Sequence, residues 1–147
     1  MDLLTRLQAD VKQAMRARDD VARDALRMVI AAIKAREIDS GRPVSVEDAR
    51  ELLKSAVKTR GDSAQQFEAA GRAELAAKER REIEVLSRYL PRQLSEEETR
   101  AVVERAIAAS GASSNRDLGR VMKVIMAAHR DEVDGKLVQR LVTELLA

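Results

Sequence analysis

Apolar side chains recur at helical spacing in the first part of the chain. They lie three or four positions apart, first in the series Leu4, Leu7, Val11 and Met15. This spacing puts apolar side chains on one face of an α-helix and polar ones on the other. Further series of this kind follow, and capping residues, Gly or Pro separate them from one another. The pattern predicts four helices, at about residues 4–18, 20–39, 46–70 and 72–90.

The remainder of the chain predicts three shorter helices. Pro91 ends the fourth helix, and Ser95 with Glu98 has the spacing of a capping box, preceded by Leu94 as a hydrophobic staple. Helices are expected at about residues 96–110, 115–129 and 135–146. No segment has the period-two alternation of a strand. We therefore expect an all-α protein with a four-helix body (residues 1–91) and a three-helix tail domain (residues 95–147).

Charged residues lie among the apolar positions of the third and fourth predicted helices. If these helices form an antiparallel hairpin about Gly71, residues whose numbers add up to about 142 face each other. Arg60 then lies opposite Glu82, with Glu79 one turn away on the same face. Charges on a core-facing stripe are costly unless they pair. We expect Arg60, Glu79 and Glu82 to form a structural, semi-buried ion pair that fixes the register of the hairpin.

An alternative is that these two carboxylates act as a general acid and base. A neighbouring Arg lowers the pKa of a carboxylate, which suits it poorly to proton transfer near neutral pH. Ion-pair networks in a core are also commoner than active sites of this type. The structural interpretation is therefore preferred, and no catalytic residue is assigned.

Composition limits the other kinds of site. Charged residues make up 35% of the chain, the net charge is +2, and there is no cysteine, which excludes disulfides and thiolate metal sites. His129 is the only histidine, and Gly111–Ser114, with Asp117, has the pattern of a helix stop followed by a cap. No metal or cofactor is therefore expected. No apolar run has membrane-spanning length, and we expect a cytoplasmic protein without a membrane partner.

A cationic series in the predicted tail suggests a nucleic-acid interface. On a continuous helix Arg116, Arg120, Lys123 and Arg130 would share a narrow arc without an acid, and the next helix adds Lys136 and Arg140. Such a ridge can follow phosphates, although it can equally be an ordinary solvated face. The tail has no aromatic side chain on which bases could stack. Any RNA contact should therefore depend on phosphate and shape.

Several short stretches follow one another along nearly the whole chain. They are Arg27-Met28, Ala31–Lys34, Glu37-Ile38, Val57-Lys58, Arg60, Asp62-Ser63, Phe67-Glu68, Gly71-Arg72, Glu79, Glu82–Leu86, Tyr89–Pro91, Gln93–Ser95, Gly111–Ser114, Gly119–Met122 and Asp134–Val138. In this order they resemble the GatB/YqeY family, and the chain looks like a stand-alone member of it.

The resemblance implies a helical body followed by a three-helix tail. A similar region ends the GatB subunit of the glutamine-dependent aspartyl/glutamyl-tRNA amidotransferase, where it contacts tRNA. We therefore expect a tRNA-binding accessory module without its own catalytic site. One alternative is a protein–protein docking module. A second is the activity implied by the family label, a carbon–nitrogen ligase with glutamine as amido-N-donor.

Overall fold

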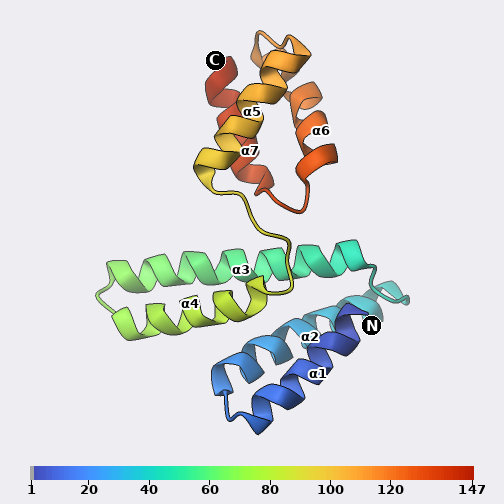
Figure 1. Cartoon of the computed structure of the whole chain (residues 1–147), viewed down its shortest axis with the longest axis vertical. Helices are drawn as coiled ribbons and strands as arrows, with labels where there is room; N and C mark the ends of the chain where they lie inside the picture. Colours follow the sequence, from blue (N-terminus) through green and yellow to red (C-terminus); the bar gives the residue numbers. More distant parts are fainter. Residues whose placement is uncertain (1) are drawn as a thin grey trace. The chain divides into compact units, whose positions relative to one another are not determined.

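The computed structural model describes residues 2–147, and these form α-helices, one short 3₁₀ helix and no strand (Figure 1). The all-α fold is therefore confirmed. The described chain divides into two compact units, the body, which ends at Leu90, and the tail, Pro91–Ala147. The elements are α1 (Leu3–Arg16), α2 (Asp20–Ser40), α3 (Val46–Ala69), α4 (Ala73–Ser87), α5 (Glu96–Ser110), η1 (Asn115–Asp117), α6 (Leu118–His129) and α7 (Gly135–Leu146).

Side-chain caps and glycines set the ends of the body helices. Asp19 accepts a hydrogen bond from the Ala22 N–H at the start of α2. Ser45 caps α3. Gly71 has a φ of 74°, which is the left-handed conformation that lets the chain reverse from α3 into α4. Local sequence chemistry therefore determines where the hairpin turns.

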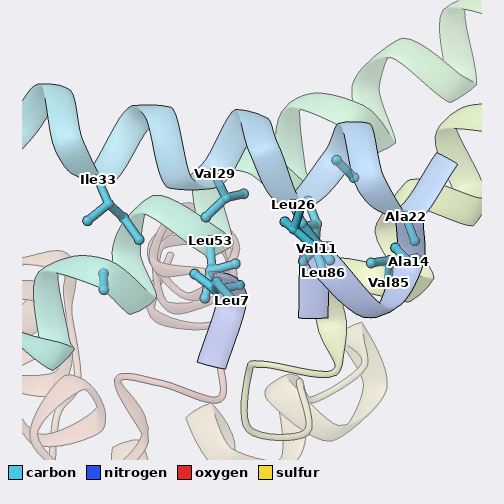
Figure 2. Close-up of a cluster of buried hydrophobic side chains, with 12 residues drawn as sticks. Leu7, Val11, Ala14, Ala22, Leu26, Val29, Ile33, Leu53, Val85 and Leu86 are labelled. Carbon is cyan, nitrogen blue, oxygen red and sulfur yellow. The ribbon is translucent and has the colours of Figure 1, made fainter. Parts of the chain in front are cut away.

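The core of the body is aliphatic and draws on all four helices. In Figure 2 one side of α2 points its side chains towards α1, α3 and α4. Leu7, Leu53 and Leu86 are fully buried there. The other buried members of the cluster are Val11, Ala14, Ala22, Ala25, Leu26, Val29, Ile33, Ala49 and Val85.

One apolar position expected to face inwards, Met15, is exposed instead, as are Val46 and Leu75. Met15, Val46 and Leu75 retain 50%, 53% and 39% of their accessible surface. Each lies in the first or last turn of its helix, where a neighbouring helix covers less of the surface. The fourth helix also ends at Ser87, earlier than predicted, because the chain tightens into i to i−3 hydrogen bonds before Pro91.

The tail folds around its own aliphatic core from α5, α6 and α7. Val103, Val121 and Leu141 are fully buried in it. The predicted capping box is confirmed at the start of α5, where Ser95 and Glu98 bond each other's backbone N–H. Arg92, followed by the Ser95 N–H, lowers the pKa of Glu98 to about 2. The capping carboxylate is therefore charged at neutral pH.

The single helix predicted for residues 115–129 is wrong in its first turn. Asn115–Asp117 form the 3₁₀ helix η1, and α6 begins only at Leu118. Ser114 makes no side-chain cap; instead the Ser113 N–H donates to the Asp117 carboxylate at 3.1 Å. The Asp117 carboxylate therefore accepts a hydrogen bond from the backbone of Ser113, one residue before the predicted partner, Ser114.

Candidate nucleic-acid interface

The six cations of the predicted ridge belong to several elements of the tail. Arg116 lies in η1, and Arg130 follows the last residue of α6. Only two of the four residues expected on one helix, Arg120 and Lys123, lie within α6, and Lys136 and Arg140 are on α7. All six side chains are exposed. A helical projection through residues 116–130 therefore does not describe their arrangement, because the backbone changes from a 3₁₀ helix to an α-helix at Leu118.

Two of the six cations are held by acids and by backbone. Arg120 donates to the Ser110 carbonyl at 2.8 Å and pairs with Asp117 at 3.1 Å. Arg140 pairs with Glu96 at 2.5 Å and reaches Glu144 at 3.9 Å. The expectation that no acid interrupts the ridge is wrong at Arg120, because Asp117 pairs with it. Both side chains are more than half exposed, so these pairs contribute little to stability.

Three other cations have no carboxylate partner in the part of the chain that the structure describes. Arg116, Lys123 and Lys136 are exposed, and no ion pair to any of them is present within residues 2–147. The contact between Lys136 and Asp134 is made by the backbone N–H of Lys136, at 3.0 Å, and not by its ammonium group. These three side chains are together called the open cations. Each can bind a phosphate group without first breaking an ion pair.

Acidic groups near the open cations are already engaged. The Ser113 N–H, followed by Arg120, lowers the pKa of Asp117. His129 Nδ1 lies 2.8 Å from Glu132 Oε2 at the end of α6. Sequence reasoning missed Ser110 and Glu96 as partners of the predicted cations. No sequence signal identifies them, because helix packing brings them from ten and 44 positions away.

In the body, the structure brings Arg60 and Glu82 together. Arg60 Nε donates to Glu82 Oε2 at 2.7 Å, and the two residues retain only 7% and 9% of their accessible surface. The guanidinium also donates to the Ala56 carbonyl at 3.0 Å and contacts the Met28 sulfur at 3.4 Å. Glu79 is half-buried and makes no ion pair with Arg60 within residues 2–147, so the predicted set of three is reduced to a pair.

A cleft of about 280 Å³ also lies in the body, between α1, α2 and the end of α4. The Tyr89 hydroxyl donates to Asp10, and the Arg6 guanidinium stacks 4.7 Å from the centre of the Tyr89 ring. Burial, followed by the bond to Asp10, raises the pKa of Tyr89 above its usual value. Tyr89 is thus a neutral donor near pH 7 that ties α4 to α1.

The described residues offer neither a cluster of metal ligands nor a membrane-spanning helix. Among residues 2–147, no three or more His, Cys, Asp or Glu residues are grouped so that they could hold a metal ion. Each helix in this range is too short or too polar to cross a membrane.

Proteins from several yeasts are similar in sequence to part of this chain. The protein "Altered inheritance of mitochondria protein 41, mitochondrial" of Clavispora lusitaniae is 36% identical over 88 residues, 60% of this chain and 51% of that protein. Its counterparts in Lachancea thermotolerans and Saccharomyces cerevisiae are each 32% identical, over 61% and 57% of this chain and 49% and 46% of their own lengths. The chain thus matches about half the length of these relatives.

The comparison with protein families extends over both units. The model of the family described as "Yqey-like protein" matches residues 4–146, from the second residue of α1 to the last residue of α7. The match therefore includes the Arg60–Glu82 pair and the open cations. The chain belongs to the YqeY-like family.

Proposed function

We propose that the tail binds structured RNA, with tRNA as the candidate, and that the protein acts as a non-catalytic accessory module. The observation that carries this proposal is the set of open cations, Arg116, Lys123 and Lys136, which are exposed without carboxylate partners. Phosphate contacts release counterions and supply most sequence-independent affinity for nucleic acid. Arg120, Arg130 and Arg140 are further exposed cations of the tail.

Local arrangement matters more here than total charge. The tail carries nine basic and nine acidic side chains, so as a whole it attracts a polyanion only weakly. Its acids are concentrated in the first turn of α5 and around residues 131–134. In contrast, Leu118–Arg130 contains three cations and no carboxylate. An RNA backbone would therefore be expected to lie along α6 and its flanking turns.

The absence of aromatic side chains from the tail sequence defines the mode of recognition. Sequence-reading RNA modules stack bases on Phe, Tyr or Trp, and residues 91–147 contain none. The expected contact reads the shape and phosphates of a folded RNA. This agrees with the resemblance to the tRNA-contacting appendage of the amidotransferase, which has the same order of body and tail.

The relatives support the family but not a particular activity. The names of these relatives mention neither tRNA nor a reaction. The names do place those proteins in mitochondria. A cytoplasmic location for this chain therefore remains a proposal, with a mitochondrial location as the alternative. A carbon–nitrogen ligase with glutamine as amido donor must release ammonia from glutamine. An enzyme-coupled ammonia assay on the purified protein would detect this activity.

Matched charge variants test RNA binding. The triple variant Arg116→Ala, Lys123→Ala, Lys136→Ala should weaken binding to total tRNA at least about tenfold in a fluorescence titration at low salt. A control with the same change of charge, Lys12→Ala, Arg36→Ala, Arg81→Ala, removes exposed cations of the body. The control should bind nearly as tightly as the unmodified protein. Equal losses in both variants would contradict a localised interface.

A specific observation also supports protein docking by the tail. An open cleft of about 220 Å³ lies between α5 and α6 and has an apolar lining that includes Val102, Ala106 and Val124. Val124 retains 52% of its accessible surface. A partner held there should remain bound after nuclease treatment and be released by Val124→Asp. If capture requires intact RNA, this second function is wrong.

A further inference from the structure

The outer face of α2 carries two unusually exposed apolar side chains. Ile38 retains 81% and Met28 61% of their accessible surface, the highest values among the large apolar side chains that the structure describes. A single exposed apolar residue is common on protein surfaces, whereas an aligned group marks an interaction site. The alignment of these two residues along one helix is therefore informative.

Met28 and Ile38 belong to one continuous stripe. Met28, Ala31, Ala35 and Ile38 are spaced by three, four and three residues, which places them on one face of a helix, and all are exposed. The opposite face is the one that Figure 2 shows pointing into the core. α2 therefore has two apolar faces, of which the body covers one. The two alanines at the centre of the outer stripe would let another helix approach closely.

One flank of this stripe is cationic. Arg27 and Lys34, two helical turns apart, are exposed, and no ion pair to either is present within residues 2–147. The Arg27 guanidinium donates to the Met15 sulfur at 3.5 Å. Arg23, the third cation on this flank, is already bound to Asp20 and Asp24 at 3.0 and 2.9 Å. The flank therefore offers two positive charges to a partner.

We propose that the stripe Met28, Ala31, Ala35 and Ile38 is a docking surface for an amphipathic helix of another protein, one that carries acidic side chains beside its apolar stripe. Apolar anchors spaced along one helix face are the usual basis of helix recognition. The partner's carboxylates, about seven residues apart, meet Arg27 and Lys34. This surface belongs to the body, so the proposal does not depend on RNA binding by the tail.

Charge argues against an antiparallel second copy of this chain as the occupant. A two-fold axis that pairs two α2 helices antiparallel through the stripe brings the same flank of both copies together. Arg27 of one copy would then lie near Lys34 of the other, and like charges repel across such a seam. An acidic partner avoids this repulsion.

Two synthetic amphipathic helices test the proposal with the full chain. They share one leucine stripe and differ only in carrying glutamate or lysine on the flanks. By fluorescence anisotropy, the glutamate peptide should bind at least about tenfold more tightly than the lysine peptide. Ile38→Asp should weaken that binding at least about tenfold. Arg27→Glu combined with Lys34→Glu should reverse the preference between the peptides.

Val46→Asp provides the control, because Val46 is an exposed apolar residue on α3 and not on the stripe of α2. It should leave peptide binding unchanged, and circular dichroism should show that every variant keeps its helicity. Equal affinity for both peptides, or no effect of Ile38→Asp, would overturn the proposal. Sedimentation that shows a dimer dissociated by Ile38→Asp would also overturn it, because a second copy would then occupy the stripe.

Discussion

The body and the tail use charged side chains in opposite ways. The body buries the Arg60–Glu82 pair inside the α3–α4 hairpin, whereas the buried polar side chain described in the tail is a neutral one, Thr99. The Thr99 hydroxyl donates to the Ser95 carbonyl within its own helix at 2.7 Å. The cations of the proposed RNA interface are all exposed. The comparison teaches that the buried Arg60 of the body holds two helices together, while the open cations of the tail have no carboxylate partner among the described residues.

The position of the buried pair explains why the body needs it. The aliphatic cluster includes Leu53 of α3 and Val85 of α4 but no buried residue farther along the hairpin towards Gly71. Beyond it, Ala64 and Ala76 are buried, and such small side chains specify register weakly. Arg60 and Glu82 supply a directional contact at the point where the aliphatic cluster ends. We infer that the pair fixes how α3 and α4 align.

The largest expected effect is on the stability of the body. Arg60→Ala should lower the free energy of unfolding by about 3 kcal/mol, because it leaves the Glu82 carboxylate buried without its partner. Urea denaturation followed by circular dichroism measures this change. The double variant Arg60→Met, Glu82→Leu should recover most of the loss, since no uncompensated charge remains. A loss of only a few tenths of a kcal/mol for Arg60→Ala would mean that the pair does not stabilise the hairpin.

A smaller effect on stability is expected from the capping box at the start of α5 in the tail. Ser95→Ala removes the side chain that accepts the Glu98 N–H bond at 3.1 Å and should cost about 1 kcal/mol of tail stability. Amide hydrogen exchange of α5 reports on the tail separately from the body. Ser55→Ala, an exposed position within α3, serves as the control and should have little effect on exchange in α5. An unchanged exchange rate in Ser95→Ala would show that the capping box does not stabilise the tail.

The smallest expected effect is a shift in the pKa of Tyr89, in the body. Tyr89 is the only tyrosine and there is no tryptophan, so ultraviolet absorbance follows it cleanly. Its pKa should lie above the usual 10.0, because burial and then the bond to Asp10 disfavour the phenolate. The raised pKa in the folded protein means that its stabilising effect is complete below pH 10 and is lost as the pH rises above it. Asp10→Asn should lower the pKa, and a titration at the usual value would contradict the contact.

Much of the fold could be predicted from local signals. Apolar spacing and capping residues indicated each helix, and the position of Gly71 placed Arg60 opposite Glu82. Burial at helix ends could not be predicted, because Met15 and Leu75 have apolar side chains but little cover from neighbours. The partners of Arg120 and Arg140 could not be predicted either, since they belong to other turns and helices. Spacing within one helix carries no information about such contacts.

The salt dependence of tRNA binding tests the central claim most directly. The logarithm of the association constant should fall linearly with the logarithm of salt concentration, and removal of Arg116, Lys123 and Lys136 should reduce that slope by about three, roughly one per phosphate contact. The body control, without Lys12, Arg36 and Arg81, should keep the slope of the unmodified protein. Binding that is absent or independent of salt, or a slope that the tail variant leaves unchanged, would contradict the account.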